Sequence, residues 1–166
     1  PGDKINKINN IVKIVASSNY SKINMISKIY KLGLDTKIHN VKSIKIAESA
    51  KIIENTQRDL NVALINEFSI FLEKFNIPYE EVMNAAKTKW NFLNFERGLV
   101  GGHCISVDPY YLIYKANKIG IKTKIISEAR KINDKMPNYF SKFILNKIKK
   151  KNPKILVLGL SFKKNC

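Results

Sequence analysis

Arginine is scarce in this sequence: of its 30 basic residues, 27 are lysines and 3 are arginines. Basic residues outnumber the 13 acidic ones, and the net charge of +17 suggests a nucleic acid or an anionic membrane as a partner. Proteins that bind bases and phosphates depend on the bidentate guanidinium of arginine, which this chain largely lacks. Lysine, isoleucine and asparagine have A/T-rich codons, so nucleotide bias explains much of the charge. We expect no nucleic-acid partner, and a basic helical nucleic-acid-binding protein is a minor alternative.

Long apolar runs and sets of metal-binding residues are missing as well. No stretch approaches the roughly 18 apolar residues of a transmembrane helix, so we expect no membrane partner. Two cysteines are too few for a disulfide framework, and no secretory leader opens the chain, so we expect a cytoplasmic location. The two histidines and two cysteines are scattered, which argues against a zinc site. No Gly-x-Gly-x-x-Gly, Walker or Gly-x-Ser-x-Gly motif occurs.

What is present is sufficient for a folded core. Hydrophobic residues make up 45% of the 166 residues, a length that fits one domain, or one domain with parts of two others. The chain begins at Pro1 without a methionine and stops at Cys166, shortly after a strand-like run. We therefore expect a fragment of a longer protein.

The first 43 residues predict the end of an α/β domain. Residues 10–16 alternate as in a strand, and residues 36–39 fit a second short strand. Between them, apolar residues at helical spacing predict a helix over residues 21–32, with Ser21 as its N-cap and Gly33 at its end. This order of elements is that of a β-α-β unit.

A long helical run follows. From about residue 43 to residue 75 the apolar residues keep a 3.6-residue period, with neither glycine nor proline. A single helix of that length would span roughly 45–50 Å, and such helices commonly bridge domains or form subunit interfaces. Two shorter helices with an unmarked break are the alternative. The apolar stripe of the long helix comprises Ile53, Leu60, Leu64, Phe68 and Phe71.

The rest of the chain is expected to be mostly helical. The expected elements are a helix over residues 79–86, an irregular loop over 88–108, a helix from Asp108 as N-cap to about Asn117 with Gly120 at its end, a helix over 125–150 that Pro137 could interrupt, and a strand over 153–159. The sequence thus predicts a mainly α protein. We expect residues 44–136 to form a central helical dimerisation domain that contains the long helix. Partial Rossmann-like α/β domains, over residues 1–43 and 137–166, are expected to flank it.

The glycine-rich segment before the helix at Asp108 has the clearest chemical character. Glycines let a backbone approach a ligand closely and offer N–H groups to an anion. Cys104 stands just before a helix start, where the partial positive charge and nearby lysines favour the thiolate. Asp108 follows four residues later. The segment indicates a nucleophilic thiol beside a phosphate-binding loop, and a buried inert cysteine beside an ordinary loop is the alternative. The glycines are Gly98, Gly101 and Gly102.

A second candidate set lies on the long helix. Lys51 and Asn55 are four residues apart and therefore share one face, which also carries Glu48. A lysine and an asparagine together can stabilise a developing oxyanion, whereas the alternative is a solvated helix face. His103, next to Cys104, suggests a Cys–His dyad only weakly, because adjacent residues in an extended loop point apart.

Three segments in a fixed order, residues 48–59, 88–93 and 98–112, resemble the UDP-glucose/GDP-mannose dehydrogenase family. The Gly-Gly-His-Cys form of the loop, with Trp90 and Asn91 before it and residues 130–134 after it, resembles the branch that acts on UDP-N-acetylhexosamines. The resemblance covers nearly the whole chain.

The resemblance implies an NAD-dependent enzyme that oxidises the C6 alcohol of a UDP-N-acetylhexosamine to a carboxylate in two steps, for surface polysaccharide biosynthesis. It implies that Cys104 captures the C6 aldehyde as a thiohemiacetal, which becomes a thioester that water cleaves. Lys51 and Asn55 would hold the C6 oxygen, and Asp108 would assist proton transfer or position the hydrolytic water.

The resemblance also implies what this chain holds and what it lacks. The UDP-sugar would be wrapped by a loop from Lys89 to Gly101, with Phe95, Gly98 and Gly102 also among the substrate-binding residues. The NAD site would belong to an N-terminal Rossmann domain of which only the last β-α-β stretch is present, so we expect the chain alone to be inactive. A homodimer is expected through the central domain. A non-catalytic, homodimerising remnant of such an enzyme is the alternative.

Overall fold

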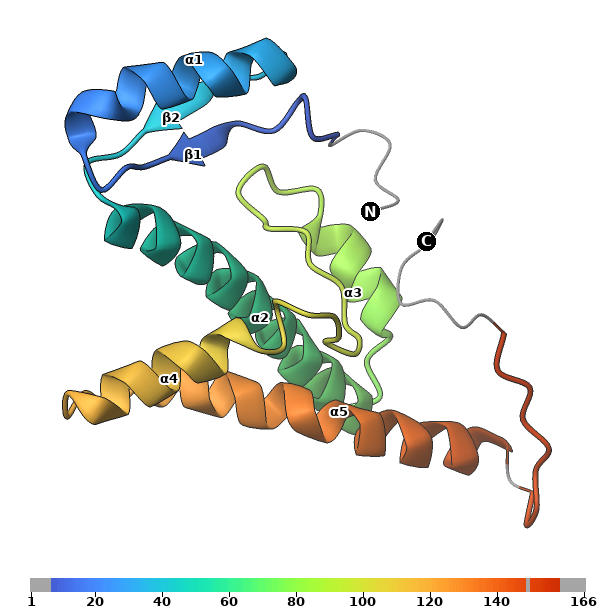
Figure 1. Cartoon of the computed structure of the whole chain (residues 1–166). Coiled ribbons are helices and arrows are strands. Elements are labelled where there is room, and N and C mark those ends of the chain that lie inside the picture. Colours follow the sequence, from blue (N-terminus) through green and yellow to red (C-terminus); the bar gives the residue numbers. More distant parts are fainter. Residues whose placement is uncertain (1–6, 149, 159–166) are drawn as a thin grey trace. The chain divides into compact units, whose positions relative to one another are not determined.

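The computed structural model describes residues 7–148 and 150–158 and divides into two compact units (Figure 1). Among these described residues, unit 1 takes residues 7–54 and Leu158, and unit 2 takes residues 55–148 and 150–157. The protein is mainly helical, with one long helix and a small parallel sheet, which confirms the predicted fold class. The domain boundaries expected at residues 43 and 136 stay predictions.

Unit 1 contains the expected β-α-β unit. Strands β1 (Lys13–Val15) and β2 (Ile38–Asn40) pair in parallel, and helix α1 (Ile23–Gly33) connects them. The hydroxyl of Ser27 on α1 donates to Asn40 Oδ1 on β2 at 2.7 Å, which joins the helix to the sheet. Both strands are three residues long, and the second begins later than the sequence pattern suggested.

The prediction that Ser21 caps α1 is wrong. A short 3₁₀ turn, Tyr20–Lys22, precedes the helix, and the side-chain oxygen of Asn19 accepts from the N–H of Ser21 at 3.1 Å. Asn19 has an extended backbone, with φ −114° and ψ 101°, so its side chain reaches the first free N–H groups. Asn19 is therefore the residue that caps this turn, and Ser21 lies inside the turn.

Helix α2 (Ile44–Lys74) is a single helix of 31 residues, so the long helix is confirmed and the two-helix alternative is wrong. It ends at Lys74, and two residues further on Asn76 has a positive φ of 54°, a conformation that asparagine adopts more readily than most residues. The N–H of Ile77 donates to the carbonyl of Leu72 at 2.9 Å, and the N–H of Asn76 donates to the carbonyl of Glu73 at 3.0 Å. These two bonds form a Schellman motif, which satisfies carbonyls that the end of a helix leaves free.

Unit 2 combines the part of α2 from Asn55 onward with three further helices (Figure 1). These helices are α3 (Tyr79–Ala86), α4 (Asp108–Lys118) and α5 (Lys124–Ile148). Helix α5 crosses α2, α4 lies along α5, and the loop over residues 87–107 joins α3 to α4. Gly120, with φ 78°, ends α4 as predicted.

Helix α5 continues through Pro137, so the interruption considered there does not occur. Proline removes one N–H from the helix ladder. The turn that contains it is held by Met136, whose side chain is fully buried. The cost of one lost backbone bond is therefore accepted within a packed helix.

The interior of unit 2 mixes apolar and polar side chains. Buried apolar residues are Ala63, Ile65, Leu72, Met83, Ala116, Ala129 and Met136. Buried polar residues are Asn55, Thr56, Asp59, Asn66, Ser69, Arg130 and Asn133. Because a buried polar group is costly unless it is hydrogen-bonded, so polar an interior requires a connected network.

The strand predicted at residues 153–159 is not formed within the described residues. Residues 153–158 have no regular structure, and Leu156, Val157 and Leu158 are largely exposed. A strand requires a neighbour with which to pair, and in the described ranges the sheet consists of β1 and β2 alone. The last residue of that predicted strand, Gly159, lies outside the described residues, as do Pro1 and Cys166.

Across residues 7–148 and 150–158, no helix is both long enough and apolar enough to span a membrane. Over the same residues, no group of three His, Cys, Asp or Glu side chains is placed to hold a metal ion.

Candidate functional site

The start of α4 is connected to α2 by a direct side-chain hydrogen bond. Asn55 is 1% exposed, and its Nδ2 donates to Asp108 Oδ2 at 2.6 Å. Asp108 is the first residue of α4, whereas the N-cap position is Val107 and forms no side-chain capping bond. The prediction that Asp108 caps the helix is therefore wrong. Its carboxylate lies against the amide of Asn55 because the helix begins one residue earlier than the capping pattern assumed.

Cys104 lies one turn before Asp108 with its side chain exposed. Its carbonyl oxygen accepts from the N–H of Val107 at 3.0 Å and from the N–H of Asp108 at 2.8 Å. These bonds fix the backbone of Cys104 against the first turn of α4. The structure thus brings together three of the predicted site residues, Cys104, Asp108 and Asn55, through one backbone bond and one side-chain bond.

The loop before Cys104 is anchored at its first glycine. The N–H of Gly98 donates to Asn66 Oδ1 at 2.8 Å, and Asn66 Nδ2 donates to the carbonyl of Gly98 at 3.0 Å. Further along, Gly102 has a φ of 94°, which favours glycine, and the hydroxyl of Ser106 donates to its carbonyl at 2.6 Å. A side chain added at Gly98 or Gly101 would meet no atom within 4 Å, so packing within this chain does not require glycine there.

Lys51 lies on α2 one turn before Asn55, so the two residues share a helix face as predicted. Its ammonium pairs with Glu54 Oε2 at 3.0 Å, and both side chains are more than half exposed. Such a pair is weak in water and leaves the lysine free to exchange partners. Lys51 belongs to unit 1 and Asn55 to unit 2.

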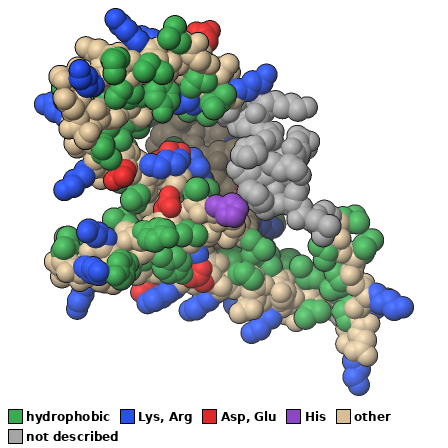
Figure 2. Space-filling model, viewed as in Figure 1, with side chains coloured by type: hydrophobic (Ala, Val, Ile, Leu, Met, Phe, Trp, Pro, Cys, Tyr) green, Lys and Arg blue, Asp and Glu red, His purple; other side chains and the backbone are tan. Residues whose placement is uncertain are grey.

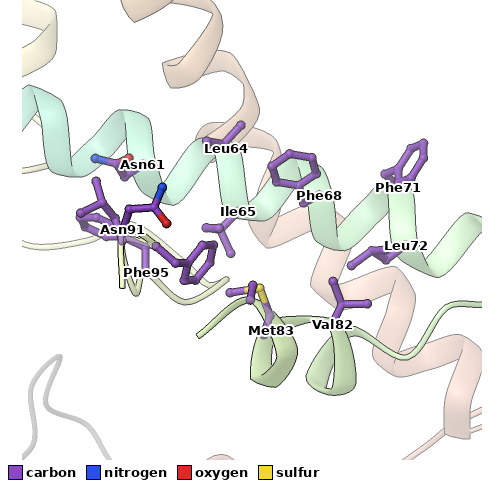
Figure 3. Close-up of a pocket in the computed structure, with 13 residues that line it drawn as sticks. Asn61, Leu64, Ile65, Phe68, Phe71, Leu72, Val82, Met83, Asn91 and Phe95 are labelled. Carbon is purple, nitrogen blue, oxygen red and sulfur yellow. The ribbon is translucent and has the colours of Figure 1, made fainter. Parts of the chain in front are cut away.

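The two remaining predicted substrate-binding residues lie on the long loop. Lys89 is exposed in the turn after α3, where its N–H donates to the carbonyl of Ala86 at 3.0 Å. Phe95 is half-buried and lines an apolar cavity of about 480 Å³ between α2, α3 and the loop (Figure 3). Figure 3 shows Ile65 pointing from α2 toward this cavity, with Phe95 beside it and Met83 of α3 below.

A buried polar network that the sequence reasoning missed lies behind the loop. Asp59 is 0% exposed and Arg130 is 4% exposed, and Arg130 Nη1 donates to Asp59 Oδ1 at 2.6 Å. Asn133 Nδ2 donates to the same oxygen at 2.8 Å and to the carbonyl of Asp59 at 3.0 Å. Asn66 Nδ2 donates to Asn133 Oδ1 at 2.9 Å, which joins the network to Gly98.

The network also reaches the first turn of α4. Arg130 Nη2 donates to Asp134, and the hydroxyl of Tyr110 donates to the other oxygen of Asp134. The guanidinium of Arg130 lies over the ring of Tyr110, 5.2 Å from its centroid. The sequence signal that could have found this network is in residues 130–134. Arg130, Asn133 and Asp134 are spaced so that their side chains lie on one helix face.

The ion pair at the centre of this network has shifted protonation equilibria. Burial raises the pKa of the Asp59 carboxyl, and it outweighs the lowering effects of the Arg130 charge and the Asn133 hydrogen bond. For Arg130, burial acts to lower the pKa of the guanidinium, but the hydrogen bond to Tyr110 and the charge of Asp59 outweigh it and the pKa is raised. Arg130 is therefore a permanent cation, and its charge limits the rise that burial causes in the pKa of Asp59.

Basic side chains do not gather into one band on the surface that Figure 2 shows. Among the residues described there, Lys and Arg side chains are scattered and are interspersed with acidic and apolar ones. This distribution offers no specific support for the nucleic-acid alternative, because nucleic-acid binding relies on a basic patch or stripe.

Comparison with known proteins gives consistent relatives. Residues 45–135 match the model of the UDP-glucose/GDP-mannose dehydrogenase family, central domain. Over 171 aligned residues the chain is 46% identical to UDP-N-acetyl-D-glucosamine 6-dehydrogenase of Salmonella typhi and 44% identical to protein CapL of Staphylococcus aureus. Both alignments cover 100% of this chain and 40% of the relative, so the chain spans about two fifths of the length of these curated relatives.

The fold has the same relatives. The solved structure of the UDP-D-ManNAc dehydrogenase from Pyrococcus horikoshii superposes with a TM-score of 0.73 at 30% identity. The superposition covers 82% of this chain and 33% of that protein.

Proposed function

Because the chain belongs to the UDP-glucose/GDP-mannose dehydrogenase family, whose central domain its residues 45–135 match, we propose that it is part of an NAD-dependent 6-dehydrogenase of UDP-N-acetylhexosamines. The relative from Salmonella typhi, 46% identical over the whole chain, is a UDP-N-acetyl-D-glucosamine 6-dehydrogenase. The reaction converts the C6 alcohol of the sugar to a carboxylate. The observation that carries the proposal is the placement of Cys104 one turn before Asp108, whose carboxylate accepts from the buried Asn55.

The residues of unit 1 do not fit an NAD site. A dinucleotide site places a glycine-rich turn between the first strand and its helix, where the backbone approaches the pyrophosphate. Strand β1 is instead followed by Ala16, Ser17, Ser18 and Asn19, with no glycine before α1. We therefore assign only the substrate side of the reaction to this chain, and NAD would bind to a part of the longer protein outside it.

On the substrate side, the thiol of Cys104 is the nucleophile. Its exposed position leaves the sulfur accessible to a C6 aldehyde, to which it adds to form a thiohemiacetal. The thiohemiacetal would become a thioester by loss of a hydride to NAD held by the rest of the longer protein. Water would then release the acid and return the thiol, with Asp108 positioning that water and accepting its proton. Asn55 Nδ2 carries two protons, of which one bonds Asp108. We propose that the second binds the C6 oxygen as negative charge develops there.

The role of Lys51 leads to a rate prediction. If its ammonium holds the C6 oxygen, Lys51→Ala in the longer protein should lower kcat by about 10²–10³, roughly 3–4 kcal/mol, with a smaller change in KM. The melting temperature should hardly move, because the side chain is more than half exposed and pairs only with Glu54 within the described residues. The measurement is NADH release with a UDP-N-acetylhexosamine.

Lys45→Ala is the matched control, because Lys45 is an exposed lysine on the same helix outside the motif. The oxyanion role of Lys51 is contradicted if both variants have the same kcat. Asn55→Ala is less suitable for this test than the sequence alone suggested. Asn55 is buried and holds Asp108, so its removal is expected to lower stability as well as rate.

The long helix supports a homodimer. Leu64, Phe68 and Phe71 are about half exposed on α2, and Ile53 is more so. Large apolar side chains in one row are typical of an interface rather than of a surface in water. We expect two copies to pack through this stripe, with Leu60 half-buried within it.

Sedimentation velocity tests the dimer. The chain should sediment as a dimer at tens of micromolar, and Phe68→Asp should shift it toward the monomer. Leu32→Asp on α1, which replaces an exposed leucine away from the stripe, should leave the dimer intact. A folded monomer in the unaltered protein would contradict the proposed interface.

A substrate panel separates the enzyme from the non-catalytic remnant. The longer protein that contains this chain should release NADH with UDP-N-acetylglucosamine or one of its C2 or C4 epimers. A folded dimer with no turnover on any of these sugars would instead support the remnant.

A further inference from the structure

We propose that Asn66 is a positioning residue, a two-bond anchor on α2 that sets the conformation of the loop carrying Cys104. The inference rests on the proposed function only in taking this loop as the substrate loop. Asn66 is fully buried, and its amide both accepts from the N–H of Gly98 at 2.8 Å and donates to the carbonyl of Gly98 at 3.0 Å. The side chain thus binds Gly98 as a neighbouring strand would, although no strand is present there in the described residues.

The loop between Gly98 and Asp108 is anchored to α2 at both ends. Asn66 holds Gly98, and Asn55 holds Asp108. The two asparagines are separated along α2 by roughly 16 Å at 1.5 Å per residue. The connecting backbone would reach roughly 33 Å if fully extended. The middle of the loop therefore has length to spare and folds back, while its two ends are fixed to one rigid helix.

The exposed part of this loop is the part that the proposed chemistry uses. Cys104 and Gly101 are exposed, whereas the anchoring side chains Asn55 and Asn66 are buried. The buried asparagines fix the two ends of the loop and leave its middle accessible to a ligand. Such an arrangement reduces the conformational freedom that the loop would lose on binding a substrate.

Only an amide suits the position of Asn66. One oxygen must accept from a backbone N–H, and one nitrogen must donate both to the carbonyl of Gly98 and to Asn133 Oδ1. The bond from Asn66 to Asn133 fixes which end of the amide faces which group of Gly98. Asn133 is itself oriented by its two bonds to Asp59. The buried network therefore orients the anchor, and the anchor holds the loop.

The first test measures hydrogen exchange at Gly98 in the full chain. In the unaltered protein the Gly98 amide should be protected, because its acceptor is fully buried. In Asn66→Ala the protection should fall at least tenfold further than the accompanying loss of global stability explains. Asn66→Asp keeps an oxygen that accepts from this N–H and should restore part of the protection. Rapid exchange of Gly98 in the unaltered, folded protein overturns the proposal even if no variant folds.

Asn133→Ala is the matched control. It removes a buried amide of the same network and the bond that orients Asn66, but neither of the two groups of Asn66 that bind Gly98. Gly98 should therefore be exposed less than in Asn66→Ala. Urea unfolding gives the stability of each variant, and exchange is compared after correction for it. If the two alanine variants expose Gly98 to the same extent, Asn66 contributes only to stability and the proposal is wrong.

The second test uses activity and separates the two proposals. In the longer protein, Asn66→Ala should raise KM for the UDP-sugar at least tenfold with a smaller change in kcat, whereas Asn133→Ala should change KM less. Equal effects of the two variants on KM would overturn the positioning role. A longer protein that is inactive with every UDP-sugar overturns the proposed function alone, because the exchange measurement decides the anchor without turnover.

Discussion

Cys104→Ser in the longer protein is expected to abolish formation of the carboxylate while leaving UDP-sugar binding intact. A serine hydroxyl has nearly the size of the thiol, so the loop and its bonds to α4 should persist. It is, however, a much poorer nucleophile at neutral pH, and within the described residues no base is hydrogen-bonded to this position that would activate it. NADH release measures the reaction, and calorimetric titration with the UDP-sugar measures binding.

Cys166→Ser is the control, because it replaces the other cysteine of the sequence and lies outside the described residues. Its rate should equal that of the unaltered protein. A Cys104→Ser variant that still produces the acid at the normal rate would remove the nucleophile from the proposal. Iodoacetamide offers a check on the chain itself: Cys104 should be alkylated faster at pH 7 than a free thiol compound.

Arg130→Ala is expected to lower the free energy of unfolding by about 3–5 kcal/mol. The substitution leaves the carboxyl group of Asp59 fully buried beside only the Asn133 donor, and it also removes the bond to Asp134. A buried charge without its counterion is more costly than the intact pair is favourable. Urea unfolding at neutral pH measures the loss.

The deficit of this variant should depend on pH. The pKa of Asp59 is already raised by burial, and removal of the Arg130 charge takes away an effect that lowers it. A carboxyl whose pKa is raised in the folded state stabilises the fold below its ordinary pKa and loses that stabilisation as the pH rises through the raised value. The deficit of Arg130→Ala should therefore be larger at pH 7 than near pH 4.

Lys131→Ala is the matched control for both measurements. Lys131 follows Arg130 on α5, is exposed and pairs with Glu128 at 2.7 Å. An exposed pair of this kind contributes little, so the change should stay within about 0.5 kcal/mol at either pH. If both variants lost the same free energy of unfolding, the buried ion pair would contribute no more to stability than the exposed pair of Lys131.

The helices were predictable because their signals are local. The apolar period without glycine or proline defined α2 to within a residue at each end, and Gly120 marked the end of α4. The β-α-β unit was recognisable for the same reason. Its strands were placed less accurately, because a three-residue strand is defined by its pairing partner more than by its own sequence.

The parts that could not be predicted depend on tertiary contacts. A sequence pattern treats Asp108 at a helix start as a cap, and only the position of α2 shows that its carboxylate bonds Asn55 instead. Asp59, Arg130 and Asn133 look like ordinary surface residues of two helices until α5 is known to cross α2. The strand expected at residues 153–159 had the right residues, but among the described elements it finds no strand to pair with.

The candidate site shows the same division. Cys104 and Asp108 are close in sequence, so their spacing alone placed them in one turn. Asn66 was not singled out, because its partner Gly98 is far along the chain and no local pattern connects them. The roles of all the predicted site residues, those of Cys104, Asp108, Asn55 and Lys51 included, stay predictions.

The buried polar contacts between α2 and α5 also select one alignment of these helices. They join Asp59 and Asn66 on α2 to Arg130 and Asn133 on α5. If α5 slid along α2 by a single turn, about 5.4 Å, Asn133 would leave both Asp59 and Asn66. Each buried group without a partner would then cost about 1–3 kcal/mol, whereas a seam of leucines could be repacked at lower cost. These polar contacts therefore fix the register of the two helices. They exclude sliding of α5 along α2 as a means of movement within unit 2.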